Sequence, residues 1–346
     1  MASKTAGAAL ACALMLALAA CGNDSSSDSD SDSASTGDSS FKPVTIKHKF
    51  GTTKIESAPK RVVTVGFNDH EFLLPLGVQP VGIRDWVGVG PVTKVPWAKD
   101  ELAAMKTKPK VLTRNDLNVE QVAALKPDLI IGVFGGMTQR EYETLSKFAP
   151  VVAPPKQYVD FGVPWQEQAL ITGRAVGKEK QAEKLVAGLE DRFEQAREEH
   201  PEFDGKAGIV PYAFEPGKYG AYASEDLRTR FITELGFKTP KKVDELAGKE
   251  FYVEFSGEQF RLMDQDAVLM YGGPRSKRKD IQGDRLYERL DAVKEGRVVY
   301  MDNEDALLGA VGLSSPLSLP YALDEAVPRL AAAVDGKPET EVKEVQ

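Results

Sequence analysis

Two runs of alternating strands and helices, separated by one long helix, restrict this chain to few folds. From Lys60 to Val133, short apolar runs alternate with helical stretches, and the alternation restarts at Ala207. Continuous apolar strands separated by helices are typical of largely parallel sheets that helices cover on both faces. The sequence therefore predicts an α/β protein with two lobes, each built on a central, parallel-rich sheet.

The long helix is predicted from Lys178 to His200, where apolar residues recur at spacings of three and four. The resulting stripe consists of Ala182, Leu185, Val186, Leu189, Phe193 and Ala196. Pro201 ends the helix, because the residue before a proline disfavours the helical conformation. At about 1.5 Å per residue the helix spans roughly 35 Å, enough to join two lobes. The predicted segments are a lobe at 42–177, the interdomain helix at 178–200, a lobe at 201–334 and a polar tail at 335–346.

A short repeated pattern indicates that the two lobes are structurally equivalent. Asn118 and Ser256 are both good N-cap residues, because their side-chain oxygens accept hydrogen bonds from free backbone N–H groups. Each is followed two positions later by a glutamate and, eight positions after that, by an aspartate that opens an apolar strand. The matched order favours duplicated lobes.

The first residues predict an export signal. Lys4 precedes an apolar run from Ala8 to Leu18, which is too short to span a bilayer, since that takes about 20 residues. The run ends in Leu18-Ala19-Ala20-Cys21-Gly22, which resembles a bacterial lipobox. The resemblance implies that the Cys21 sulfur receives a diacylglyceryl group before cleavage, so that 1–20 is a lipoprotein signal peptide. A plain signal peptide with an incidental cysteine is the alternative.

The next segment predicts a flexible membrane tether. Residues 22–40 contain nine Ser and five Asp, and such a composition cannot bury enough surface to offset the entropy of ordering. A flexible chain of this length has an r.m.s. span of roughly 25 Å. With lipidated Cys21, the tether 21–41 is expected to anchor the protein to the outer face of the cytoplasmic membrane, where two or more acyl chains hold a protein stably.

Composition and motifs exclude several classes of function. A net charge of −8 argues against general nucleic-acid binding, which needs clustered cations. Two cysteines and three histidines exclude zinc ribbons and iron–sulfur clusters, and His48, His70 and His200 are too scattered to predict a bare-metal site. No nucleophile elbow, zincin motif or phosphate-binding loop is present, so we expect no enzyme. An exported hydrolase or a purely structural lipoprotein remains the alternative.

Five segments, in order along the chain, resemble the cobalamin and iron-siderophore substrate-binding proteins of ABC importers. They are Ala58–Val63, Leu76–Gly82, Lys126–Ile130, Ala292–Val298 and Pro320–Asp324. The resemblance runs from about residue 42 to 334 and implies two Rossmann-like lobes joined by a rigid helix, with the ligand in the cleft between them. It also implies a monomer that delivers its ligand to an ABC permease dimer with its ATPase.

A ferric siderophore is the expected ligand. Because the oxygens of such a chelate already saturate the iron, the protein needs aromatic walls and cationic donors rather than metal ligands. We therefore expect no cofactor and no protein-bound metal, the iron being bound only as a siderophore chelate. Haem or cobalamin, with the same transport role, is the alternative. The bridging helix predicts modest closure of the lobes.

Candidate ligand contacts in the first lobe lie after predicted strands, because ligands of α/β sheets bind beyond the carboxyl ends of the strands. Arg84 and Trp86 follow the strand at Pro80–Ile83, and Trp97 lies in an irregular loop. Arg114 stands six residues before Glu120. The family resemblance implies that an arginine at this offset reaches the chelate oxygens.

Candidate contacts in the second lobe are Tyr212, Tyr219 and Tyr222, around a predicted loop after the strand at Ile209-Val210, and Arg275. Each has an ordinary alternative, since loop tyrosines often cap a core and arginines are often solvated. The basic run from Arg275 to Lys279 is interpreted as a solvated loop that would also favour an anionic catecholate chelate.

Glu120 and Glu258 are the candidate permease-docking residues. A carboxylate in the first turn of a helix is favourable by about 0.3–1 kcal/mol through the helix dipole, which would by itself explain either glutamate. The resemblance implies instead that each glutamate docks onto an arginine pocket of one permease subunit. Matched positions in the two lobes suit a two-fold symmetric partner.

Overall fold

Two separate sheets divide the chain into halves in the computed structural model, which describes residues 41–84, 94–112, 116–215, 217–256, 259–337 and 339–343. The first sheet has the order β5-β4-β3-β6-β7, and every pairing in it is parallel. Its strands are β3 (Val62–Thr64), β4 (Gly82–Arg84), β5 (Lys110–Leu112), β6 (Leu129–Ile131) and β7 (Val151–Val152). The parallel α/β prediction is confirmed for this lobe.

Helices and one hairpin surround the first sheet. The antiparallel hairpin consists of β1 (Val44–His48) and β2 (Gly51–Ile55). The helices are α1 (His70–Leu73), η1 (Leu74–Leu76), η3 (Pro96–Ala98), α2 (Lys99–Ala103), α3 (Val119–Ala124), α4 (Gln139–Leu145) and α5 (Trp165–Ala175).

The second sheet is mixed. It has the order β11-β10-β9-β12-β13, with β8 also pairing to β12. Its strands are β8 (Gly208–Ile209), β9 (Pro211–Glu215), β10 (Lys218–Tyr222), β11 (Tyr252–Glu254), β12 (Ala267–Gly272) and β13 (Val298–Met301). Strand β12 is parallel to β8, β9 and β13, whereas β10 runs antiparallel to β9 and β11. The loop expected after Ile209-Val210 is therefore a hairpin.

A tight turn explains this hairpin. Gly217 has φ +77°, a left-handed conformation that glycine adopts without steric cost. The dipeptide Pro216-Gly217 is a turn signal in the sequence, and reading it would have predicted the hairpin. The helices of this lobe are η4 (Pro201–Phe203), α7 (Leu227–Glu234), α8 (Lys241–Ala247), η5 (Gln259–Met263), α9 (Arg275–Gln282), α10 (Asp291–Lys294), α11 (Ala306–Leu313) and α12 (Ser318–Ala333).

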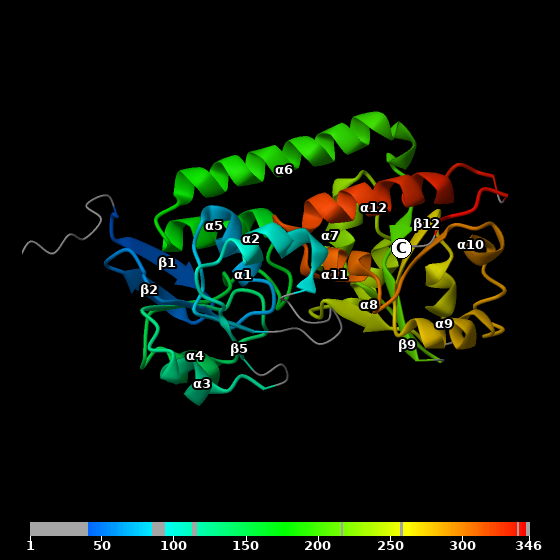
Figure 1. The fold of residues 1–346 in the computed structure, drawn as a ribbon. Coiled ribbons are helices and arrows are strands. Elements are labelled where there is room, and N and C mark those ends of the chain that lie inside the picture. Colours follow the sequence, from blue (N-terminus) through cyan, green and yellow to red (C-terminus); the bar gives the residue numbers. More distant parts are fainter. Residues whose placement is uncertain are drawn as a thin grey trace, which may run out of the picture. The chain divides into compact units, whose positions relative to one another are not determined.

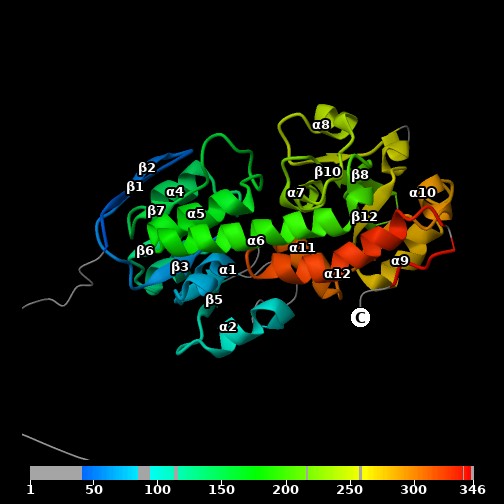
Figure 2. The same ribbon diagram turned by 90° about the horizontal axis from the view of Figure 1, so that it is seen from above.

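Helix α6 (Glu179–Glu199) joins the two halves (Figures 1 and 2). Its buried residues are Ala182, Val186, Leu189, Phe193 and Ala196, which is the predicted stripe except for the half-buried Leu185. Ala182 packs in the core of the first lobe, whereas Phe193 packs in a cluster that extends through the second. The bridging helix is thus a part of both cores. Among the described residues, no helix is long and apolar enough to cross a membrane.

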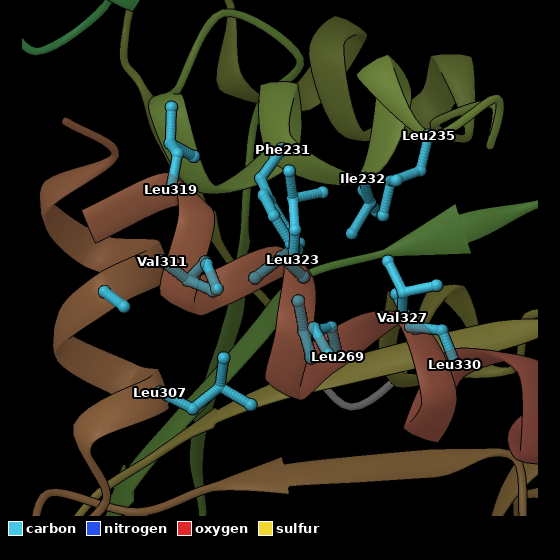
Figure 3. Packing of buried hydrophobic residues seen from close by; sticks show 14 of the residues in the cluster. Phe231, Ile232, Leu235, Leu269, Leu307, Val311, Leu319, Leu323, Val327 and Leu330 are labelled. Atoms are coloured by element: carbon cyan, nitrogen blue, oxygen red, sulfur yellow. The ribbon is translucent and has the colours of Figure 1, made fainter. Parts of the chain in front are cut away.

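The core of the second lobe continues into the first. Figure 3 shows Phe231 and Ile232 of α7 close to Leu323 and Val327 of α12. The same cluster includes Phe72, Trp165 and Ala169 of the first lobe. Apolar packing therefore runs without interruption from one lobe to the other.

The duplicated pattern has a structural counterpart in its aspartates. Asp128 accepts hydrogen bonds from the backbone N–H groups of Lys60 (2.8 Å) and Arg61 (2.7 Å), just before β3. Asp266 accepts one from the N–H group of Ala207 (2.8 Å), just before β8. Each aspartate thus holds the backbone just before the first strand of its lobe's central sheet, β3 or β8. The helix starts differ between the lobes. Asn118 caps helix α3, whereas the corresponding segment of the second lobe forms the 3-10 helix η5.

Candidate ligand-binding site

An arginine and a phenylalanine meet at the carboxyl edge of the first sheet. Arg84, the last residue of β4, is 7% exposed and places its guanidinium 4.4 Å from the ring centroid of Phe67, which follows β3. Its Nη1 donates a hydrogen bond to the Val65 carbonyl oxygen (3.2 Å). Burial lowers the pKa of Arg84, and the nearby acids Glu141 and Asp116 oppose this shift. The structure thus places Arg84 at the predicted edge.

Four phenylalanines continue this edge toward the second lobe. The ring of Phe161 lies 6.4 Å from Phe67 and 5.1 Å from Phe134, both of the first lobe. On its other side Phe161 lies 5.0 Å from Phe251 of the second lobe. Phe161 has φ +63°, a strained value for a residue with a side chain. A constrained aromatic residue therefore makes ring contacts with both lobes.

In the second lobe, a buried arginine lies between the rings of two tyrosines. Arg228 is 5% exposed, and its guanidinium lies 4.0 Å from the ring centroid of Tyr222 and 5.2 Å from that of Tyr271. Its Nη1 donates a hydrogen bond to Asp226 Oδ2 (2.8 Å). Burial disfavours the charged form of the guanidinium, but the neighbouring Asp226 carboxylate stabilises it, so the pKa of Arg228 is raised overall. Burial also raises the pKa of Tyr271 to about 12. The sequence analysis missed Arg228.

Two of the predicted tyrosines belong to this group. The ring of Tyr212 lies 5.4 Å from Tyr222 and 6.2 Å from Tyr252. Gly220 pairs with Tyr212 across the hairpin, and a Cβ there would lie 2.3 Å from the tyrosine oxygen. Only a residue without a side chain lets the Tyr212 ring lie across β10. The aromatic wall of the second lobe is here defined as Tyr212, Tyr222, Tyr252, Tyr271 and Arg228.

Tyr219 does not join the aromatic wall. It lies three residues before Tyr222 on β10, so it points to the opposite face of the sheet. There its hydroxyl donates to Asp284 Oδ2 (2.9 Å), and its ring packs edge-on against Phe260 at 4.8 Å. The two tyrosines consequently belong to separate hydrophobic clusters.

Arg275 is held by acids of its own lobe. Its Nε donates to Asp302 Oδ2 (3.1 Å), and its Nη2 donates to Asp305 Oδ1. The run from Arg275 to Lys279 forms helix α9 rather than the expected loop, because Pro274 is compatible with a helix start and arginine and lysine are good helix formers. Arg278 also pairs with Asp302, at 2.5 Å. The basic run is thus partly neutralised by acids that follow β13.

The indole of Trp97 points to the junction between lobes. Its Nε1 donates to Glu71 Oε1 (2.9 Å), and its ring lies 5.8 Å from Tyr321 of α12. The predicted residues Trp86, Arg114, Glu258 and Cys21 lie outside the described residues. Glu120 is exposed, in the first turn of α3.

A buried polar junction, which the sequence analysis missed, joins α1 to the second lobe. Glu71 accepts a hydrogen bond from the Ser315 hydroxyl as well as from Trp97. Asn68 Nδ2 donates to the Leu313 carbonyl oxygen (2.8 Å). Burial raises the pKa of Glu71 to about 7.

Asp69 and His70 extend this junction. Gln168 Nε2 donates to Asp69 Oδ1 (2.8 Å), and three backbone N–H groups also donate to this carboxylate. Burial raises the pKa of Asp69 to about 6 and lowers that of His70 to about 4. Among the residues that the structure describes, no group of three or more His, Cys, Asp or Glu is placed to hold a metal ion.

Comparisons with known proteins agree with this architecture. A family model described as Periplasmic binding protein matches residues 62–304. The probable siderophore-binding lipoprotein YfiY of Bacillus subtilis (strain 168) is 28% identical over 282 residues, which cover 77% of this chain and 82% of YfiY. The structure of Streptococcus pneumoniae TIGR4 PiaA in complex with ferrichrome is similar with a TM-score of 0.75 and 27% identity, covering 85% of this chain and 99% of PiaA.

A periplasmic solute binding protein from Mycobacterium smegmatis str. MC2 155 is similar with a TM-score of 0.73 and 31% identity, covering 84% of this chain and 99% of that protein. Both solved proteins share the two-lobed α/β architecture that the sequence predicted. Because the family model spans well over half of the chain, this protein belongs to the Periplasmic binding protein family.

Proposed function

We propose that this protein is an extracytoplasmic substrate-binding lipoprotein that captures a ferric siderophore and delivers it to an ABC importer. The observation that carries the proposal is a continuous series of aromatic contacts between two buried arginines, Arg84 beside Phe67 in one lobe and Arg228 in the aromatic wall of the other. The aromatic contact of Phe161 with Phe251 connects them. The names of YfiY and of the PiaA–ferrichrome complex support the same ligand class.

The chemistry of the site suits a chelate. Aromatic faces and guanidinium groups bind the organic shell and the oxygens of a ferric siderophore without displacing them from the iron. Arg228 forms an ion pair with Asp226, so it supplies directional N–H groups with little net charge. This arrangement favours a weakly charged chelate over a strongly anionic one. Arg84, Tyr212 and Tyr222 remain proposed contacts, as do Trp86, Trp97 and Arg114.

The membrane anchor and the partner are further parts of the proposal. Two Bacillus subtilis relatives are named lipoproteins, which supports lipidation at Cys21. We assign Glu120 and Glu258 to docking on a permease dimer that works with its ATPase. No cofactor enters the proposal, since iron is carried only within its chelate.

Fluorescence quenching tests the ligand class. The chain has three tryptophans, so residues 40–346, which form one compact unit, can be titrated with a ferric hydroxamate, a ferric catecholate, haem and cobalamin. Saturable quenching by one ferric chelate is expected. Binding of haem or cobalamin instead would contradict the ferric siderophore as ligand, and no binding at all would overturn the proposal.

The Arg228→Ala variant tests the site. The variant loses charge-assisted hydrogen bonds and ring stacking, so its affinity for the chelate should fall by about 2 kcal/mol, or roughly 30-fold. Arg275→Ala is the matched control, because Arg275 is held by Asp302 and Asp305 outside the aromatic wall, and it should keep the affinity within about twofold. Equal losses in both variants would contradict the assignment of the aromatic wall.

A further inference from the structure

A group of cations lies at the end of the first lobe that is remote from the candidate site. A hollow of about 890 Å³ is lined by residues at the amino ends of β3, β4 and β5, whereas Arg84 and Phe67 lie at or beyond the carboxyl ends. Its lining includes five cations and no acid: Lys60, Arg61, Lys106, Lys108 and Lys110. This surface is therefore distinct from the ligand-binding edge.

A second, apolar hollow adjoins the first. It measures about 480 Å³ and shares Lys108 and Pro109 with its neighbour. Its floor is apolar, and Lys94 and Lys99 add two further cations at its edge. The apolar residues are Val95, Pro96, Leu102, Ala103, Met105 and Pro109. The lysine surface is here defined as both hollows together. On β5, an edge strand of the sheet, Val111 is 39% exposed.

In the part of the chain that the structure describes, no ion pair involves a cation of the lysine surface. Lys60, Lys106, Lys108 and Lys110 are exposed, and the described residues give none of their side chains an ion-pair partner. The Arg61 guanidinium donates to the uncharged carbonyl oxygens of Leu125 and Lys126. The Asp128 carboxylate bonds the backbone N–H groups of Lys60 and Arg61 rather than their side chains.

Helix α9 provides the contrast. Its Arg275 and Arg278 pair with Asp302, and Lys277 pairs with Asp280. In a chain with a net charge of −8, uncompensated lysines gathered on one surface are therefore a specific feature rather than a general excess.

We propose that the lysine surface docks onto the anionic phospholipid surface of the membrane that carries the protein. Lysines beside the exposed Pro96, Ala103 and Val111 match such a surface, because the cations attract anionic headgroups while exposed apolar groups contact the headgroup boundary. The choice of a bilayer as occupant rests on the proposed lipid anchor. Lipidation at Cys21, which is part of the proposed function, would keep the protein at a high local concentration near lipid, so a weak contact suffices.

Vesicle co-sedimentation tests this docking without the anchor. Residues 40–346 form one compact unit, which can be mixed with vesicles of phosphatidylcholine alone or with about one-third phosphatidylglycerol. We expect binding to the anionic vesicles only, and at least a tenfold loss when salt is raised from low to high concentration, since salt screens exposed charges. Equal binding to both vesicles, or to neither, overturns the proposal.

A triple variant identifies the surface. Lys106→Ala, Lys108→Ala and Lys110→Ala together should reduce partitioning on the order of 100-fold, since each cation near an anionic membrane contributes about 1 kcal/mol. Lys241→Ala, Lys242→Ala and Lys249→Ala remove three exposed lysines around α8 and form the matched control, expected within about twofold of the wild type.

The outcomes are decisive in each direction. An equal loss in the control would show that net charge alone drives binding and would overturn the docking surface. Saturable binding of inorganic phosphate by the lysine surface, with no partitioning into vesicles, would overturn the membrane as occupant. The vesicle assay uses no chelate, so its failure is independent of the failure of ligand binding.

Discussion

At the scale of single residues, two arginines of the second lobe differ in how far along the chain their acidic partners lie. Arg228 and Asp226 are two residues apart, so both stay on the same turn beside Tyr222 and Tyr271. Arg275 meets acids 27 and 30 residues away, which hold it against the loop after β13. The sequence analysis selected Arg275 as a candidate contact, because its acidic partners lie far along the chain and cannot be identified without the fold.

Tyr222 and Tyr219 provide a test of the aromatic wall within one strand. Tyr222→Leu keeps an apolar side chain but removes the ring beside Arg228, so we expect the affinity for the ferric chelate to fall by about 1–2 kcal/mol. Tyr219→Leu removes a ring from the opposite face and should leave the affinity unchanged, while losing the hydrogen bond to Asp284. Titration of both variants measures this difference, and an equal effect would contradict the two-faced arrangement.

At the scale of elements, the helices and strands that the sequence predicted correctly are those with a clear apolar periodicity. The stripe on α6 and the apolar strands of the first sheet were predicted because burial requires one face of a helix and both faces of a parallel strand. The β9–β10 hairpin was missed, because a turn of two residues leaves little trace in apolar periodicity. The tyrosines of the aromatic wall lie on β9, β10, β11 and β12 and depend on that hairpin, so apolar periodicity alone predicted only part of the site.

The exposed glutamate on α3 allows a test of docking. Charge reversal at both Glu120 and Glu258 should leave chelate affinity intact but abolish uptake of radioactive iron by cells, because the permease contact would become repulsive. Glu179→Lys is the control, since Glu179 is an exposed first-turn acid of α6 and loses the same helix-dipole stabilisation of about 0.3–1 kcal/mol. Unchanged uptake in the double variant would rule out docking through these residues.

At the scale of the whole molecule, the two lobes are held by packing and by buried polar groups together. Apolar contacts run from Phe72 into the second lobe, and Asn68 and Glu71 bond Leu313 and Ser315 beside them. Unlike an apolar contact, the Glu71 carboxylate changes charge in the physiological pH range. Stability of the lobe junction should therefore depend on pH.

Unfolding experiments on Glu71→Gln isolate this dependence. The pKa of Glu71 is raised from 4.5 in the unfolded chain to about 7, so the folded state binds the proton more tightly. Its contribution to the free energy of unfolding is present in full below about pH 4.5 and is lost as pH rises through 7. The wild type should lose about 2–3 kcal/mol relative to the variant over this window.

The contributions of the other titrating groups at the junction cancel when the wild type is compared with Glu71→Gln. The pKa of His70 is lowered to about 4, so its contribution grows with pH up to 6.5, opposite to that of Glu71. Asp69 acts in the same direction as Glu71, with a pKa of about 6. Both are present in the wild type and in Glu71→Gln, whose amide can still bond Trp97 and Ser315. Denaturant unfolding from pH 4.5 to 8, with the exposed Glu183→Gln as the flat control, measures the difference, and a wild-type curve parallel to that of Glu71→Gln would show that this carboxylate is not the titrating group at the junction.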